Sequence, residues 1–141
     1  MHALIIEDEA LIAMTIEEVL RGCGFTSFDF AMSSEEAIGF SKSTCPDLIT
    51  ADVELNPGSG IEAVNVICSG PSIPVIFITG TPDEVTSKMP LHPIVVKPFT
   101  VEAVVTAVEV ALAGGRSEAL AEPSPSFRIF NGSNPAAIRQ V

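Results

Sequence analysis

Strand-like and helix-like patterns of apolar residues alternate along the first 113 residues of the chain. The strand patterns are short and mostly apolar, and they lie at residues 3–6, 25–31, 47–51, 74–78 and 92–96. The helix patterns repeat apolar residues every three or four positions, at residues 9–21, 34–43, 60–68, 83–89 and 101–112. Five strands alternating with five helices predict an α/β fold, a doubly wound sheet of five parallel strands with helices on both faces.

The composition changes at Gly114-Gly115, where the last helix pattern ends. Residues 116–141 are rich in Ser, Pro, Glu and Asn and contain one apolar patch, at Phe127, Ile129 and Phe130. We therefore expect one domain over residues 1–113 and a Ser/Pro-rich tail over residues 114–141. The patch could fold back on the domain, swap to a second copy in a homodimer, or dock another partner, and we favour packing.

The charge of the chain restricts its partners. A net charge of -11 with only seven Lys and Arg residues argues against nucleic-acid binding, so we expect protein partners. No apolar run approaches the ~20 residues of a membrane span and no secretory signal is evident, so we expect a cytoplasmic protein. Three widely spaced cysteines, Cys23, Cys45 and Cys68, are expected to be reduced core thiols rather than a disulfide or metal framework.

Polar residues follow four of the predicted strands. Glu7 and Asp8 follow the first, Asp52 the third, Thr79 the fourth and Lys97 the fifth. The ends of parallel strands meet at one edge of the sheet, where ligands bind in open α/β folds. Taken singly, Asp8 or Thr79 could cap a helix, Asp52 could start a turn and Lys97 could be solvated. Taken together they predict a cluster of carboxylates, which is costly unless a cation or a proton relieves it.

At these residues the sequence resembles the receiver domains of bacterial two-component response regulators, over residues 1–113. The shared motifs are a strand-end aspartate followed eight residues later by Gly60, together with Glu7-Asp8-Glu9, Thr79-Gly80 and Lys97-Pro98-Phe99. The resemblance implies a flavodoxin-like (βα)5 sheet with strand order 2-1-3-4-5. It also implies a stand-alone signalling protein and not an enzyme, because the tail is too short for an output domain.

The resemblance implies a role for each acidic residue. Carboxylates without a histidine or thiolate nearby suit a hard cation such as Mg²⁺. By similarity to the family, Asp8 and Asp52 would bind Mg²⁺ directly, Glu7 would act through water, and the backbone carbonyl of Glu54 would supply a further ligand. Asp52 would accept the phosphoryl group from a histidine kinase or a histidine phosphotransfer protein.

The two other site residues also take their roles from the family. Lys97 would neutralise charge on the transferring phosphoryl oxygens, and it could pair with Asp52 before phosphorylation. The Thr79 hydroxyl would move to bond a phosphate oxygen. Family structures commonly have a cis bond between this Lys and Pro, so we predict a cis Lys97-Pro98 bond.

Two residues depart from the family, and one segment resembles the signature of a subfamily. Ile94 stands where response regulators carry the Tyr or Phe that reports phosphorylation. Asn56 stands where the loop after the phosphoacceptor usually has Pro. The segment from Phe77 to Pro82, Phe-Ile-Thr-Gly-Thr-Pro, is similar to a degenerate Phe-Ala-Thr-Gly-x-Tyr signature of a receiver subfamily linked to stress signalling in alphaproteobacteria.

Two other functions compete with the phosphoaccepting switch. One is a receiver-like module that regulates a kinase by binding, independently of phosphate, and it is motivated by Ile94 and the short fourth helix. The other is an enzyme on a similar scaffold, a flavin carrier or an aspartate phosphohydrolase. Glu7-Asp8-Glu9 would repel a flavin phosphate, and a phosphohydrolase would place its Asp-x-Asp pair after the first strand, whereas Asp52-Val53-Glu54 is mid-chain.

Overall fold

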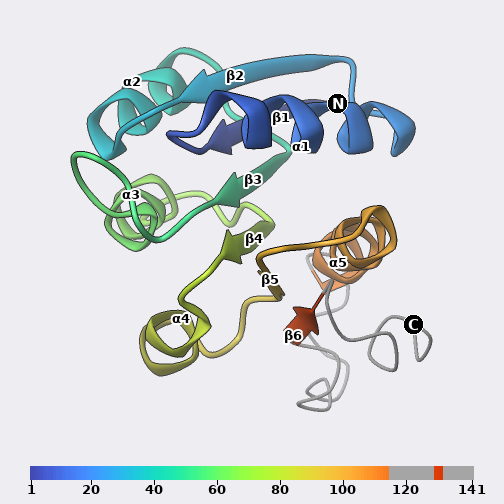
Figure 1. The fold of residues 1–141 in the computed structure, drawn as a ribbon. Helices are drawn as coiled ribbons and strands as arrows, with labels where there is room; N and C mark the ends of the chain where they lie inside the picture. The colour runs from blue at the N-terminus through green and yellow to red at the C-terminus, as the bar shows by residue number, and fades with distance from the viewer. Residues whose placement is uncertain (115–128, 132–141) are drawn as a thin grey trace.

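The computed structural model of the chain describes residues 1–114 and 129–131. Within them, one parallel sheet has the strand order β2-β1-β3-β4-β5-β6 (Figure 1). Its strands are β1 (His2–Ile6), β2 (Ser27–Ala31), β3 (Leu48–Ala51), β4 (Val75–Thr79), β5 (Ile94–Val96) and β6 (Ile129–Asn131). The predicted α/β fold with order 2-1-3-4-5 is confirmed, and β6 extends the sheet beyond β5.

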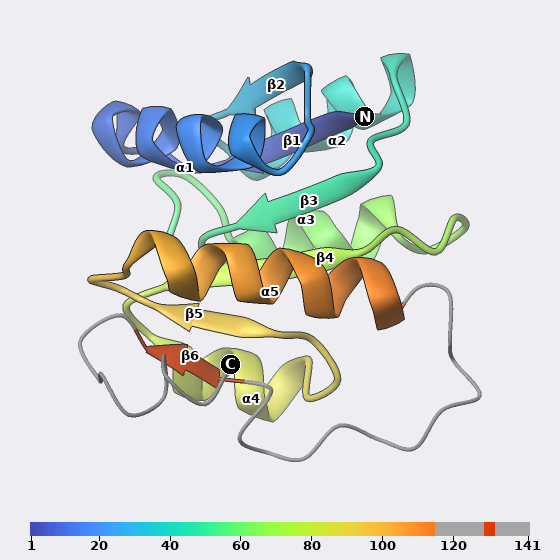
Figure 2. The same cartoon turned by 90° about the vertical axis from the view of Figure 1, so that its right-hand side faces the viewer.

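The helices cover both faces of the sheet. Figures 1 and 2 show α1 (Ala10–Gly22) and α5 (Val101–Gly114) side by side on one face. On the opposite face lie α2 (Ser34–Ser43), α3 (Gly60–Ile67) and α4 (Pro82–Lys88). Because every strand pairing is parallel, all the carboxyl ends of the strands lie at one edge, which is the edge of interest for function.

Side-chain hydroxyls fix where three of the helices begin. The Ser33 hydroxyl accepts from the Glu36 amide at 3.1 Å, Ser59 from the Ile61 amide at 3.2 Å, and Thr100 from the Ala103 amide at 3.2 Å. Each bond satisfies one of the amides that a helix leaves free in its first turn.

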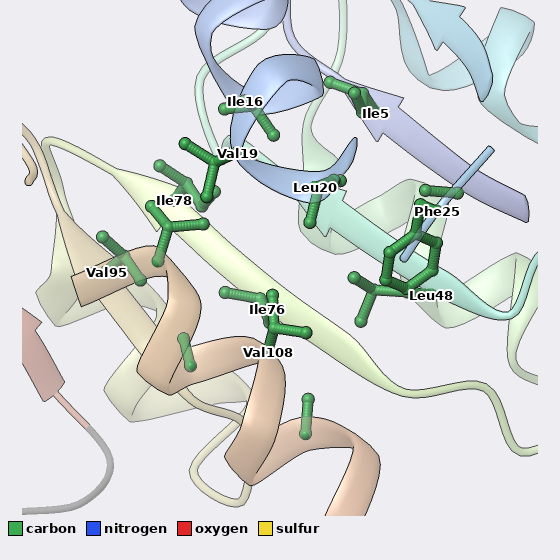
Figure 3. Packing of buried hydrophobic residues seen from close by; sticks show 14 of the residues in the cluster. Ile5, Ile16, Val19, Leu20, Phe25, Leu48, Ile76, Ile78, Val95 and Val108 are labelled. Atoms are coloured by element: carbon green, nitrogen blue, oxygen red, sulfur yellow. The ribbon is translucent and has the colours of Figure 1, made fainter. Parts of the chain in front are cut away.

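The apolar core has two layers, one on each side of the sheet. The layer under α1 and α5 includes Phe25, Leu20 and Ile76 (Figure 3), and the layer under α2, α3 and α4 includes Phe77 and Ile61. Burial on both faces explains why β3 and β4 are apolar almost throughout, since neither face meets water.

Three predictions need correction or completion. The apolar pattern predicted for residues 101–112 includes Val101, but this first residue of α5 is exposed, and the buried face begins at Ala103. All three cysteines are free, but Cys45 lies in an exposed loop and not in the core. In the tail, β6 folds back along β5, while Phe127 and the other tail residues lie outside the described part of the chain. Among the described residues, no helix has the length and apolar character needed to cross a membrane.

Candidate functional site

Adjacent strands bring the three acidic residues together. β1 pairs with β3 in a register that sets Ile6 beside Ala51, and the Asp52 amide donates to the Ile6 carbonyl at 3.0 Å. Glu7 and Asp8 therefore leave β1 at the level where Asp52 leaves β3. One carboxylate oxygen from each of Glu7, Asp8 and Asp52 lies within 4.8 Å of the other two.

Burial makes this cluster electrostatically costly. The exposed fraction is 3% for Glu7 and 7% for Asp52, and Asp8 is half-buried. Burial raises the pKa of Glu7; the hydrogen bond and charge of Lys97 oppose this in part, and the charge of Asp52 adds to it. The site thus holds Glu7 in a setting that disfavours its ionised form.

Lys97 bridges the two buried carboxylates. Its Nζ atom donates to Glu7 Oε1 at 2.8 Å and to Asp52 Oδ2 at 2.9 Å. Its amide donates to the Thr79 carbonyl at 2.9 Å, which fixes the side chain at the end of β5. Burial lowers the pKa of Lys97, but the hydrogen bonds and charges of Glu7 and Asp52 outweigh it, so the pKa is raised and the ammonium form is favoured.

The loop after Asp52 turns back under the site. The Gly60 amide donates to the Val53 carbonyl at 3.1 Å, and a Cβ atom at Gly60 would lie 2.0 Å from the Asp52 carbonyl oxygen. Only glycine allows this approach, which explains its place eight residues after Asp52. In the same loop, the Glu54 side chain is exposed and its amide lies 3.4 Å from Asp52 Oδ1.

Thr79 ends β4 at the same edge of the sheet and is fully buried. Its hydroxyl oxygen accepts from the Thr81 amide at 3.0 Å and lies 3.1 Å from the Thr81 hydroxyl. The structure therefore brings Thr79 to the edge that holds the carboxylates and Lys97, with its hydroxyl bonded on the side of Thr81.

The donor set fits a hard divalent cation. Among the described residues this is the one cluster of potential metal ligands, and it consists of carboxylates without imidazole or thiolate. When Glu7, Asp8 and Asp52 are ionised, three negative charges face the single positive charge of Lys97, which leaves a surplus of two. Oxygen ligands and a double negative charge suit Mg²⁺.

A comparison of the chain with known protein families agrees with the order of its motifs and with the geometry of this sheet edge. A family model, the response regulator receiver domain, matches residues 3–109. The chain belongs to the response regulator receiver family. The fold predicted from that resemblance is therefore the fold of the family as well as of the structure.

Two curated relatives of this receiver are regulators of bacteria. It is 39% identical over 113 residues to the phyllosphere-induced regulator PhyR of Methylorubrum extorquens, covering 77% of this chain and 42% of PhyR. It is 32% identical over 115 residues to the transcriptional regulatory protein PdtaR of Mycobacterium tuberculosis, covering 79% of this chain and 56% of PdtaR. The receiver thus spans about half the length of these curated relatives.

Solved structures give the same result. The solution NMR structure of the REC domain of the response regulator PhyR from Erythrobacter litoralis matches with a TM-score of 0.73 at 35% identity. The match covers 79% of this chain and 89% of that domain.

This receiver keeps one further family feature and lacks another. The Lys97-Pro98 bond is cis, as predicted, and Asn56-Pro57 is a second cis bond. Ile94 is 1% exposed and lies beside Phe77 in the sheet, so the position of the usual aromatic residue is filled by a packed aliphatic side chain. An aliphatic residue locked in the core cannot exchange a ring between buried and exposed positions.

Thr81, which contacts Thr79, is not among the site residues that the sequence motifs predict. Its signal lies in its position, because a hydroxyl residue directly before Pro82 is a typical helix N-cap. Family motifs draw attention to Thr79-Gly80 and not to the residue that follows.

Proposed function

We propose that this receiver accepts a phosphoryl group on Asp52 from a phosphohistidine of a histidine kinase or phosphotransfer protein. The observation that carries the proposal is the state of the Asp52 carboxylate. Its Oδ2 atom is held by Lys97 at 2.9 Å, while Oδ1 accepts only a long bond of 3.4 Å from the Glu54 amide. One oxygen is oriented and the other is left for attack.

The transfer is a substitution at phosphorus. An Asp52 oxygen forms the new P–O bond, the P–N bond to the donor imidazole breaks, and its electron pair stays on the imidazole nitrogen, which takes up a proton. Lys97 neutralises charge on the transferring oxygens from its position between Glu7 and Asp52.

The acidic cluster would hold Mg²⁺ for this reaction. We propose that Asp8 and Asp52 are direct ligands of Mg²⁺ and that Glu7 contacts it through water. The backbone carbonyl of Glu54 would be a further ligand. When bound, Mg²⁺ supplies positive charge to the phosphoryl oxygens. The surplus negative charge and the oxygen-only donor set support this assignment.

We further propose that the receiver signals through protein contacts and is not itself an enzyme. PhyR and PdtaR carry names of regulators, which supports this interpretation. The phosphodonors named above act in the cytoplasm, so the proposal places the chain there. We take residues 1–113 as the receiver and the remainder as a tail, and a homodimer stays a proposal.

Incubation with Mg²⁺ and a small phosphodonor tests the function. The wild type should gain one acid-labile phosphoryl group by mass spectrometry, and Asp52→Asn should gain none. Asp47→Asn is the matched control because Asp47 immediately precedes the other end of the same strand, where it accepts from the His2 amide at 2.7 Å. Incorporation into Asp52→Asn would refute the site.

A second function is favoured by Ile94. If the aromatic reporter is replaced by a core residue, the receiver could regulate a kinase by binding alone. Binding to the partner kinase would then be unchanged by Asp52→Ala, whereas the phosphoacceptor proposal expects affinity to depend on phosphorylation of Asp52.

A further inference from the structure

The helix α4 begins differently from its neighbours. Ser33, Ser59 and Thr100 use their hydroxyls to cap α2, α3 and α5, as described above. Thr81 stands at the N-cap position of α4 and carries the same functional group, but it makes no side-chain cap bond. The Thr81 hydroxyl therefore does not cap α4 in this structure.

The Thr81 hydroxyl is bonded to Thr79. A threonine hydroxyl has one hydrogen to donate and two lone pairs to accept with. The Thr79 oxygen already accepts from the Thr81 amide at 3.0 Å, and its second bond, at 3.1 Å, is to the Thr81 hydroxyl. Since Thr79 is fully buried, water does not compete for these two bonds.

We propose that Thr81 is a positioning residue that holds the Thr79 hydroxyl away from Asp52 and caps α4 when Thr79 turns to the phosphoryl group. This inference rests on the proposed phosphorylation of Asp52. In this exchange the Thr79 hydroxyl moves toward the phosphoryl group and gives up its two bonds to Thr81. The Thr81 hydroxyl is then free to accept from the amides that the first turn of α4 leaves without partners inside the helix.

The start of α4 is suited to receive this hydroxyl. Pro82 is its first residue and has no amide hydrogen, so a cap from Thr81 would go to the amides of Asp83 or Glu84. Gly80, between the two threonines, is exposed, and a Cβ atom there would meet nothing within 4 Å. The loop therefore has open space around Gly80.

The exchange supplies a route for output that needs no aromatic ring. In this receiver Ile94 is locked in the core, so the Thr79 hydroxyl has no ring to displace. The two bonds between Thr79 and Thr81 are instead given up, and the Thr81 hydroxyl accepts a bond from the first turn of α4. The expected result is that α4 becomes more ordered at its first turn when Asp52 is modified.

Amide hydrogen exchange of Asp83 and Glu84, with and without beryllofluoride and Mg²⁺, tests the exchange. In the wild type, protection should rise about fivefold on addition of beryllofluoride, the equivalent of ~1 kcal/mol for an N-cap bond. Thr81→Ser should behave like the wild type. Thr81→Val should show no rise in protection. Its affinity for beryllofluoride should be within about twofold of that of the wild type, because the variant loses both the hydroxyl bond to Thr79 and the cap bond to α4.

Two controls separate the possible failures. Thr86→Val removes another hydroxyl of α4, which donates to the Pro82 carbonyl, and should leave the rise in protection intact. A full rise in Thr81→Val, with beryllofluoride bound, would overturn the exchange and leave the phosphoacceptor intact. Failure of the wild type to bind beryllofluoride, read from its ¹⁹F signal, would overturn the proposed function and the exchange with it.

Discussion

Carboxylates lie in two regions of the sheet, and the two regions differ in how the charges are paired and buried. Around His2, near the amino end of β1, two acids are each bound to a different group of that residue. Asp29 pairs with the His2 ring at 2.9 Å, and exposed Asp47 accepts from the His2 amide at 2.7 Å. At the carboxyl ends, Glu7 and Asp52 are buried and share one ammonium group.

The contrast separates carboxylates that complete the fold from carboxylates that are held ready for chemistry. A paired acid near the surface adds little and needs nothing more. A buried group of acids with too few cations lowers stability, and it persists because the surrounding sheet is stable enough to hold it. The first region is therefore structural, and the second is the place where a cation and a phosphoryl group would relieve the charge.

Removal of Lys97 should have the largest effect on this contrast. Lys97→Met leaves Glu7 and Asp52 buried without their cation, and we expect a loss of about 3–5 kcal/mol in the free energy of unfolding at neutral pH without Mg²⁺. Urea unfolding measures it. Lys88→Met is the control, since Lys88 pairs with Glu84 on the surface, and it should change stability by less than ~1 kcal/mol. Equal effects would remove the distinction between the two kinds of pair.

A methyl group at Gly60 should have the next largest effect. Gly60→Ala places a Cβ atom 2.0 Å from the Asp52 carbonyl oxygen, so the backbone must shift, at an expected loss of about 1–3 kcal/mol. Gly39→Ala is the matched control within a helix, because a Cβ atom there meets nothing within 4 Å, and it should gain about 0.5–1 kcal/mol. Thermal unfolding would reveal the opposite signs; a neutral Gly60→Ala would contradict the close approach.

The pH dependence of stability should reveal the cost of Glu7. Because its folded pKa is raised above 4.5, ionised Glu7 destabilises the fold, and this contribution grows as the pH rises through the folded value. Glu7→Gln removes the charge. Without Mg²⁺ the variant should therefore be more stable than the wild type at about pH 8, and this advantage should shrink toward about pH 4. Urea unfolding measures the difference in stability between the two proteins. A constant difference across that pH range would show that the ionised form of Glu7 does not destabilise the fold.

Much of the fold and the site could be predicted because both depend on local pattern. Parallel topology follows from alternating strands and helices, and it carries Glu7, Asp52 and Lys97 to one edge without further information. Exposure of Val101 and Cys45 could not be predicted, since it depends on where an element stops covering its neighbour. The pairing of β6 with β5 likewise depends on a return of the chain that no local pattern encodes.

The partner of a hydroxyl is also beyond local pattern. Thr81 has the sequence signature of a helix cap, yet its hydroxyl bonds Thr79, because the loop brings the two hydroxyls within 3.1 Å. Tertiary geometry decides which of two possible hydrogen-bond partners a side chain binds. Residues of this kind are the ones a motif search passes over.

The smallest effect is expected in the region around His2. Asp29→Asn removes the charge that faces the His2 ring, in a pair whose Asp29 side chain is 28% exposed, so the loss of stability should be about 0–1 kcal/mol. Urea unfolding at neutral pH measures this, and phosphoryl incorporation on Asp52 should be unchanged because Asp29 binds His2 and is not part of the acidic cluster. A loss above ~2 kcal/mol would mean that both regions of the sheet depend on their charges alike, and the division between structural and reactive carboxylates would fail.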